Sequence, residues 1–370
     1  MSELDILRKD IDVIDAALVE LFERRMELVA RVADIKEQNG IGVLNSNREE
    51  EVIKHNMELL KNKELSPQLE MFLRSVMDIS KGLQKNRMRG IGKEGVKVGF
   101  QGTRGSFGHE AAVDYFGKEA ELLEYVEFSD VFSSLERGDV EYGVLPIENS
   151  STGSITQVYD LLGSYGFYIV GEICVKVSHN LMAIKGTKLE DIEEVYSHMQ
   201  AFEQSSRYFK RHPGWKLIPY HNTAYSARYV AQSGDTTKAA VGSLNAAKLY
   251  DLEVLANGIN DSSNNFTRFV IIGKEMSADA EADKISLYLS IKHQPGALHE
   301  TLGYFSKNGL NMIKIESRPA KESAWEYMFY IDFEGNINDE NTKKAIEEIK
   351  SSSSYCRILG NYKAYAGAGE

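Results

Sequence analysis

Apolar residues follow a helical period along the first 36 positions of the chain. They recur at spacings of three and four at Leu4, Leu7, Ile11, Ile14, Leu18, Leu21, Leu28, Val32 and Ile35. This spacing predicts one long amphipathic helix, about 50 Å if unbroken, with an a/d seam of the coiled-coil kind. Two further amphipathic segments, near 46–61 and 66–85, predict two more helices. Residues 1–90 are therefore expected to form an all-α domain.

One position of this seam is polar, Arg25. A buried arginine without an anion is costly, so it indicates either an anion site or a register-setting pair with a neighbouring helix. Lys36 lies within about 20° of Arg25 around the helix, and Ser80 and Gln84 share a face of the third helix. Arg8 points about 100° away from Arg25, so it cannot easily reach the same ligand within one protomer. Polar groups directed inward suggest a site within the bundle.

A different pattern begins near residue 95, where short apolar runs alternate with helical periods up to residue 273. This alternation predicts an α/β domain. The run at 144–147 ends in Glu148 and a stretch rich in Asn, Ser, Thr and Gly. Such a junction is a common way to build an anion site at a helix N-terminus, although an ordinary capping loop has the same composition. Similar residues follow the predicted strands that end near residues 100, 196, 218 and 241. If all five strand ends faced one cleft, helix N-termini would converge on an anion.

The C-terminal part follows the order strand, helix, strand, strand, helix, strand. This order predicts an α+β domain with a ferredoxin-like fold, which could also be a purely structural appendage. Polar linkers lie near 85–95 and 274–283. The sequence therefore predicts three domains, at 1–90, 95–273 and 284–366.

Length and composition agree with several domains of a soluble globular protein. The chain has 370 residues, 42% hydrophobic and 26% charged, and its net charge of −12 argues against nucleic acid as the main partner. Cys174 and Cys356 have the spacing of neither a disulfide framework nor a zinc site. No apolar run approaches the roughly 20 residues of a membrane span, and the N-terminus is unlike a signal peptide. We therefore expect a cytoplasmic protein without a membrane partner.

The polar residues of the helical domain, taken together, resemble the active-site set of the all-helical chorismate mutases. The matching residues are Arg8, Arg25, Lys36, Arg48, Glu49, Ser80 and Gln84. In that family the first helix is exchanged across a dimer, which implies that Arg8 serves the site of the partner chain. Asn45 stands where the family usually has Asp. Because Asn can still hydrogen-bond a hydroxyl, we expect a modest effect on mutase efficiency.

The resemblance also implies a role for each residue in the rearrangement of chorismate to prephenate. Arg25 and the partner's Arg8 would hold the two substrate carboxylates. Lys36 and Gln84 would contact the ether oxygen, and Glu49 the ring hydroxyl. Further substrate contacts are implied at Asn45, Arg48 and Ser80. This unimolecular reaction requires a fixed substrate conformer and donors where charge grows on the ether oxygen, without a nucleophile or a metal ion.

Several segments of the central domain resemble prephenate dehydratases: PIENSSTGS at 146–154, SHMQA at 197–201, the AAVGS and AAKLYDLEVL run at 239–255 with Asn260 and Asp261, and above all NNFTRF at 264–269. The resemblance implies two α/β lobes, similar to those of periplasmic-type binding proteins, with the active site in the cleft between them. It places Thr267 at the catalytic position, with Arg268 holding a substrate carboxylate. Supporting donors are implied at Thr103, Asn149, Ser150, Ser197 and Gln200. The family usually has Pro where this chain has Met199, a change that spares the neighbouring His198.

Prephenate dehydratases convert prephenate to phenylpyruvate with loss of carbon dioxide and water. Aromatisation drives the step, so the resemblance implies no cofactor. The protein must bind two carboxylates and assist the departure of hydroxide. Since a threonine hydroxyl is a poor acid by itself, we infer a relay through Glu148, His198 or water and leave the proton donor open.

The segments KHQPGALHETL and IESRPAK resemble an ACT domain of the phenylalanine-responsive kind. The residues that match its ligand motifs are Gly296, Ala297, Leu298, Glu316, Ser317, Arg318 and Pro319. The resemblance implies that phenylalanine binds at a dimer interface and inhibits the enzyme. Such inhibition requires different affinities for two states of the protein.

Together the resemblances indicate the family of bifunctional chorismate mutase/prephenate dehydratases. Chorismate and prephenate would be the substrates, phenylalanine the effector, and the assembly a homodimer or homotetramer without cofactor or metal. A preference for arogenate, a ligand sensor without chemistry, and a helical domain kept only for dimerisation remain as alternatives. The presence of Thr267, Glu148 and the mutase residues favours an enzyme over a sensor.

Overall fold

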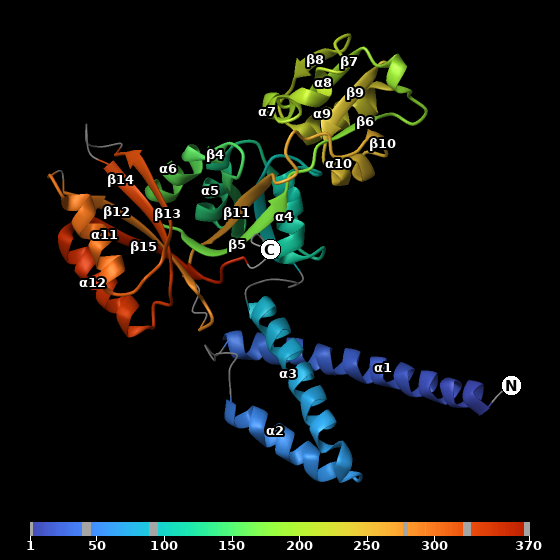
Figure 1. The fold of residues 1–370 in the computed structure, drawn as a ribbon, viewed down its shortest axis with the longest axis vertical. Coiled ribbons are helices and arrows are strands. Elements are labelled where there is room, and N and C mark those ends of the chain that lie inside the picture. Colours follow the sequence, from blue (N-terminus) through green and yellow to red (C-terminus); the bar gives the residue numbers. More distant parts are fainter. Residues whose placement is uncertain are drawn as a thin grey trace. The chain divides into compact units, whose positions relative to one another are not determined.

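The computed structural model describes residues 3–38, 46–88, 95–276, 280–292, 294–320 and 327–365. The chain divides into two compact units, Met1–Glu94 and Gly95–Glu370, which are described separately (Figure 1). The first unit is helical. The second contains two mixed α/β sheets and an antiparallel β-sheet with helices. The predicted fold classes are thereby confirmed.

The first unit consists of α1 (Glu3–Gln38), α2 (Ser46–Leu59), the short 3₁₀ helix η1 (Lys63–Leu65) and α3 (Ser66–Met88). α3 packs against both α1 and α2. Ala33 and Met77 are buried there, but Leu7, Ile11 and Leu18 of the predicted seam are 48–55% exposed. Figure 1 shows the N-terminal half of α1 extending past α3. The seam is therefore uncovered in a single chain, and in the C-terminal half of the helix Leu28, Val32 and Ile35 are also 43–58% exposed.

The first lobe of the second unit is a sheet with the strand order β2-β1-β3-β11-β5, with β4 paired to β3. Its strands are β1 (Lys97–Gln101), β2 (Glu121–Tyr125), β3 (Tyr142–Asn149), β4 (Gly153–Ser154), β5 (Tyr168–Lys176) and β11 (Phe266–Gly273). α4 (Phe107–Phe116) covers one face, and α5 (Phe128–Arg137) and α6 (Thr156–Ser164) cover the other. β1 runs parallel to β2 and β3, whereas β11 lies antiparallel between β3 and β5. A strand from late in the sequence therefore lies in the centre of this lobe.

The second lobe has the strand order β10-β6-β9-β7-β8. Its strands are β6 (Asn180–Ala183), β7 (Glu194–Ser197), β8 (Lys216–Pro219), β9 (Lys238–Gly242) and β10 (Glu253–Ala256). Its helices are η2 (Leu189–Asp191), α7 (Met199–Glu203), α8 (Ser206–Phe209), α9 (Thr223–Ser233) and α10 (Leu244–Leu249). The chain enters this lobe after β5 and leaves it before β11. Because β5 and β11 pair with each other, the two segments that connect the lobes begin and end on adjacent strands.

The C-terminal domain has the predicted order of elements. They are β12 (Lys284–Ile291), α11 (Ala297–Lys307), β13 (Met312–Pro319), β14 (Tyr327–Glu334), α12 (Glu340–Ser352) and β15 (Ser353–Tyr362). The strands form an antiparallel sheet in the order β13-β14-β12-β15, so β13 is an edge strand. α11 and α12 pack on one face around Phe305, Phe333 and Ile349.

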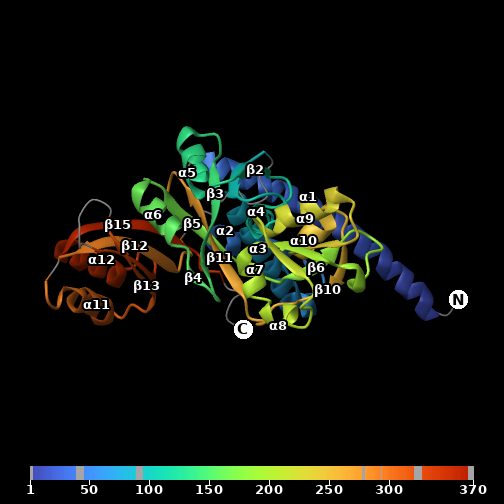
Figure 2. The same cartoon turned by 90° about the horizontal axis from the view of Figure 1, so that it is seen from above.

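The first lobe lies between the C-terminal domain and the second lobe, as Figures 1 and 2 both show. β15 packs against β5 so closely that a Cβ atom at Gly360 would lie 2.1 Å from the carbonyl oxygen of Ile169. Only glycine allows this approach of the two backbones. Arg357 strengthens it by donating to the carbonyl oxygens of Tyr165 and Phe167 at 2.8 and 2.6 Å. The C-terminal sheet is thus docked directly on the first lobe.

Candidate active sites

A cavity of about 320 Å³ is lined by residues of both lobes. Among the residues predicted for catalysis or binding, Thr267, Asn149, His198 and Gln200 line it. A more open hollow of about 490 Å³ is lined by Arg207 and other residues of the second lobe. Since none of the predicted residues lines that hollow, the smaller cavity is the candidate dehydratase site.

Four of the five strand ends predicted to hold an anion line the cavity, namely those after β1, β3, β7 and β8. Two of them lead into the N-termini of α4 and α9, where Ser106 accepts from the backbone of His109 at 3.2 Å and Asn222 from that of Tyr225 at 2.7 Å. The fifth end follows β9, and its Ser243 hydroxyl instead donates to the carbonyl of Gly105 at 2.8 Å. Helix N-termini attract negative charge. The cavity therefore suits an anion, although none of its described lining residues is Lys or Arg.

A bulge in β3 determines which residues face this cavity. Arg268 of β11 pairs with Glu148, but the next residue, Phe269, pairs with Pro146, which leaves Ile147 as the extra residue. Proline cannot donate to a sheet ladder, and a bulge changes the alternation of side chains. As a result Pro146 and Asn149, three residues apart, both line the cavity.

The Asn149 side chain holds the hydroxyl of Thr267. Its Oδ1 accepts from the backbone of Ser151 and Thr152 at 3.0 and 3.1 Å, which requires its Nδ2 to point the other way. Nδ2 donates to Thr267 Oγ1 at 2.9 Å. The hydroxyl therefore acts as an acceptor toward Asn149, and its own proton is left for another acceptor. Because Thr267 lines the cavity, that acceptor can be a bound molecule.

Three residues that the sequence analysis missed extend this arrangement. Asn149 Nδ2 also donates to Asn265 Oδ1 at 2.8 Å, and Asn265 Nδ2 donates to Gln204 Oε1 at 3.0 Å. Gln204 Oε1 lies 2.9 Å from His179 Nε2. An oxygen that accepts here requires the proton on Nε2, and burial lowers the pKa of His179, so the imidazole is neutral. Asn265 belongs to the NNFTRF segment, whereas His179 and Gln204 are revealed only by their contacts.

The predicted proton relay through Glu148 is not supported by its position. Glu148 points away from the cavity and accepts from Arg268 Nη2 at 3.0 Å and from Lys314 Nζ at 2.9 Å. Burial opposes its ionisation, but hydrogen bonds from Lys314 and Arg268 hold the pKa of its carboxyl below the usual value. Glu148 is therefore an ionised structural carboxylate in this structure, without a proton to donate.

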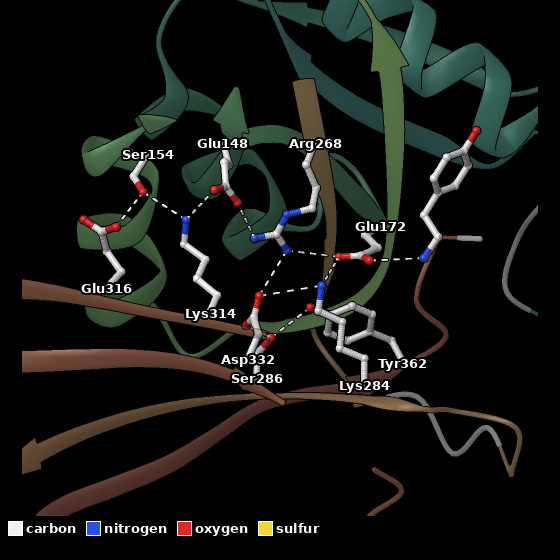
Figure 3. A network of polar contacts seen from close by, with 11 residues as sticks. Glu148, Ser154, Glu172, Arg268, Lys284, Ser286, Lys314, Glu316, Asp332 and Tyr362 are labelled. Carbon is white, nitrogen blue, oxygen red and sulfur yellow. Dashed lines mark hydrogen bonds and ion pairs between the residues drawn. The ribbon is translucent and has the colours of Figure 1, made fainter. Parts of the chain in front are cut away.

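Arg268, predicted to hold a substrate carboxylate, also lies on the far face of β11. Neighbouring residues of a strand face opposite sides, and Thr267 and Phe269 take the cavity side. The guanidinium bonds to Glu148, Glu172 and Asp332 (Figure 3). Although burial disfavours its charge, Asp332 and Glu172 keep the pKa of Arg268 raised. In this structure Arg268 therefore binds carboxylates of the protein and does not line the cavity.

Three predicted hydroxyl donors are engaged elsewhere and do not line the cavity. Thr103 donates to Glu124 at 2.7 Å, and Ser197 donates to the carbonyl of Val241 at 2.9 Å. Ser150 donates to the carbonyl of Asn264 at 3.2 Å and accepts from the backbone of Phe266 at 2.9 Å. These hydrogen bonds fix the ends of the strands, so the three residues have a structural role in this structure.

The helical unit brings two of its predicted site residues together. Arg25 of α1 donates to the hydroxyl of Ser80 on α3, and Ser80 donates in turn to the carbonyl of Val76 at 2.5 Å. Burial lowers the pKa of Arg25. One turn beyond Ser80, the buried Oε1 of Gln84 has no hydrogen-bond partner among the residues that the structure describes. A buried polar atom of this kind indicates a missing partner.

Two other predicted mutase residues lie on α1, and three have side chains that the structure does not describe. Lys36 is half-buried on α1, and Arg8 is exposed near the start of that helix. Asn45 lies outside the described residues, as do the side chains of Arg48 and Glu49.

The residues predicted to bind phenylalanine are divided between two faces of β13. Glu316 accepts from Ser154 at 2.6 Å, and Arg318 donates two bonds of 3.0 Å to Asp160, so both face the first lobe. The alternate residues Ser317 and Pro319 are exposed. The remaining predicted residues are at the start of α11, where Gly296 has a φ of 86° before the buried Ala297 and the exposed Leu298.

The folds define a multidomain protein with a helical unit, two α/β lobes and an antiparallel sheet domain, and the cavity between the lobes suits a small anion. Sequence profiles match three families: chorismate mutase type II at residues 7–85, prephenate dehydratase at 98–277 and the ACT domain at 285–351. The bifunctional chorismate mutase/prephenate dehydratase of Aquifex aeolicus is 33% identical over 369 residues, which cover 98% of each chain. The chain belongs to the bifunctional chorismate mutase/prephenate dehydratase family.

Two solved structures resemble the larger part of the chain. Prephenate dehydratase from Arthrobacter aurescens, solved in complex with L-Phe, is 29% identical with a TM-score of 0.67, covering 74% of this chain and 91% of that one. A protein described as GqqA, a novel type of quorum quenching acylase, is 28% identical with a TM-score of 0.68, covering 73% of this chain and 98% of that one.

Proposed function

We propose that the cavity between the two lobes is the prephenate dehydratase site and that Thr267 is its catalytic residue. The enzyme has chorismate mutase and prephenate dehydratase activities, as its family membership implies. The observation that carries the assignment of the site is the Thr267 hydroxyl, which is held by Asn149 at 2.9 Å and lines the cavity.

In this site the ring carboxylate of prephenate leaves as carbon dioxide, and its electron pair aromatises the ring as the ring hydroxyl departs. A hydrogen bond from Thr267 to that oxygen stabilises the negative charge that develops there, and a proton must then reach it to form water. His198 lines the cavity and is our proposed proton donor. The N-termini of α4 and α9 and the side chain of Gln200 attract the carboxylates.

For the helical unit we propose that Arg25, Ser80, Gln84 and Lys36 form the mutase site. Arg25 would bind a carboxylate of chorismate, and the unpartnered Gln84 would contact the ether oxygen. Asn45, Arg48, Glu49 and the partner's Arg8 keep the substrate roles implied by the family. The exposed seam of α1, with Leu7 and Ile11 each 55% exposed, supports a homo-oligomer in which a second chain covers this face.

For the C-terminal domain we propose that phenylalanine binds near Gly296, Ala297, Leu298 and Ser317 and inhibits the dehydratase. The L-Phe complex of the Arthrobacter relative supports this regulation. The domain limits 1–90, 95–273 and 284–366 are part of the proposal. Within the described ranges, none of the helices combines the length and apolarity of a membrane span. The cytoplasmic location stays a prediction.

Supplying chorismate, prephenate and arogenate separately, with and without phenylalanine, tests these assignments. We expect turnover of chorismate and prephenate, formation of phenylpyruvate, and inhibition by phenylalanine. Turnover of prephenate but not of chorismate would show that the helical unit serves only for assembly. Faster turnover of arogenate than of prephenate would refute prephenate as the preferred substrate.

A further inference from the structure

The strand β11 connects the proposed catalytic hydroxyl with a charged network on the other side of the sheet. Thr267 lines the cavity, and the next residue, Arg268, is buried against three carboxylates (Figure 3). Its Nη1 donates to Glu172 and Asp332 at 3.0 and 3.1 Å, and its Nη2 to Glu148 at 3.0 Å. Because Thr267 and Arg268 are joined by one peptide bond, the contacts that hold the guanidinium also restrain the backbone that carries the hydroxyl.

The strand β3 has the same arrangement. Glu148 lies in the network and the next residue, Asn149, holds Thr267. Glu148 pairs with Arg268 and Asn149 pairs with Thr267 in the register of β3 and β11. The cavity-facing pair and the network-facing pair are therefore adjacent rungs of one ladder.

The C-terminal domain supplies half of the network. Lys314 of β13 lies 2.9 Å from Glu148, Lys284 of β12 lies 2.7 Å from Glu172, and Asp332 of β14 bonds to Arg268. Among the described residues that form direct ion pairs here, three cations meet three carboxylates, and a fourth carboxylate, Glu316, is joined to Lys314 through Ser154. Removing one partner of such a buried pair leaves an uncompensated charge, which is strongly unfavourable. The network therefore has one preferred arrangement, and both domains contribute to it.

The edge strand β13 also holds the turn that carries Asn149. Lys314 donates to Ser154 at 3.0 Å, and Ser154 donates to Glu316 at 2.6 Å. Ser154 is in β4, which pairs with Glu148 and Asn149 of β3. Lys314 therefore contacts both strands of this hairpin, on the face opposite the cavity.

We propose that Arg268 and Lys314 are positioning residues for the dehydratase reaction. Lys314, which belongs to the C-terminal domain, fixes the positions of Glu148 and β4. Arg268 binds Glu148 and thereby fixes the neighbouring residue pair of the sheet, Thr267 and Asn149. The C-terminal domain thereby completes the dehydratase site without a residue in the cavity. This inference rests on the proposed role of Thr267.

The test compares Lys314→Met with Lys307→Met in the full-length protein. Lys307 is a control for the loss of a lysine ion pair, because its contact with Glu348, at 2.7 Å, lies wholly within the C-terminal domain, although its side chain is more exposed than that of Lys314. We expect Lys314→Met to lower the dehydratase kcat by roughly 10- to 100-fold, the effect of a misplaced catalytic group, with KM for prephenate within about threefold. Lys307→Met and the mutase activity of both variants should match the wild type. Lys314→Arg should restore most of the kcat because it can still pair with Glu148.

A double-mutant cycle with Glu148→Gln separates positioning from a general loss of stability. If the two residues act through one contact, the double variant should have a kcat no lower than that of the slower single variant. Additive losses, or equal losses in Lys307→Met, would overturn the proposal. If Lys314→Met does not fold, Ser154→Ala provides the test, because it removes a contact of Lys314 with β4 without removing a charge. A wild-type kcat in that variant would equally overturn it.

Failure of the positioning role and failure of the proposed catalytic role of Thr267 give different results. An inactive Thr267→Val with a fully active Lys314→Met contradicts only the positioning role. An active Thr267→Val contradicts the proposed catalytic residue, whatever the result at Lys314.

Discussion

Replacement of Thr267 by alanine tests the dehydratase assignment most directly. The hydroxyl lost in this variant accepts from Asn149 at 2.9 Å, but Asn149 Nδ2 keeps two other acceptors, Asn265 Oδ1 at 2.8 Å and the carbonyl of Phe266 at 3.1 Å. The amide of Asn149 is therefore not left unsatisfied. Losing one neutral hydrogen bond and one buried methyl group should lower the free energy of unfolding by about 1–2 kcal/mol.

The expected effect on the reaction is larger than this effect on stability. Loss of one donor to charge that develops in the transition state costs about 2.7–4 kcal/mol, a factor of about 10² to 10³ in kcat. The assay follows phenylpyruvate formation at saturating prephenate, with chorismate loss measured on the same preparation. Because the mutase residues are in the other unit, chorismate turnover should be unchanged.

Two further variants show whether the hydroxyl is responsible. Thr267→Val keeps the volume without the hydroxyl and should be as slow as Thr267→Ala. Thr267→Ser keeps the hydroxyl and should recover to within about tenfold of the wild type, given the freedom of the smaller side chain. A kcat for Thr267→Ala within threefold of the wild type would refute the reasoning, and so would a valine variant as fast as the serine variant.

Two other predictions concern the helical unit and the charged network. Gln84→Ala should lower the mutase kcat/KM by roughly 10²-fold while the unfolding temperature and the dehydratase activity stay unchanged, since its Oε1 has no partner among the described residues. Unchanged chorismate turnover in that variant would contradict the role of Gln84. Burial opposes the ionisation of Asp332, but Arg268 and Lys284 hold its pKa below the usual value. Its contribution to stability is therefore present above the unfolded pKa of about 4 and is lost as the pH falls through the folded pKa. Calorimetry between pH 3 and 7 should show a drop in unfolding temperature below about pH 4 that is smaller in Asp332→Asn than in the wild type. Equal drops in the two proteins would argue against a contribution of ionised Asp332 to stability.

Local patterns were sufficient for the elements and the fold classes. The spacing of apolar residues along α1, the alternation of strands and helices after residue 95 and the order of elements after residue 284 are all found as predicted. Periodicity predicts the type of an element because a helix or strand that packs on one side has its apolar residues on one face. It does not predict what covers that face, since the predicted seam of α1 is exposed in the single chain. The family could also be recognised from the sequence, because motifs such as NNFTRF are contiguous.

The direction of individual side chains was harder to predict. Glu148 and Arg268 lie within the most recognisable motifs, next to Asn149 and Thr267, and the motifs alone predict one site for all four residues. Strand alternation and the bulge at Ile147 send the first two to the opposite face, where Lys284, Lys314 and Asp332 meet them. These partners come from the C-terminal domain, for which the sequence predicts a separate fold and no residue of the dehydratase site.

The sequence by itself determined the elements, the order of the domains and the family of this protein, because these depend on local periodicity and on contiguous motifs. Only the tertiary structure decided which polar residues of those motifs face the cavity and which hold the C-terminal domain in place. The physical reason is that a buried charge requires a partner, and the partners of Glu148 and Arg268 are distant in the chain. Pairing over such distances is established by packing of the sheets, which no local pattern encodes.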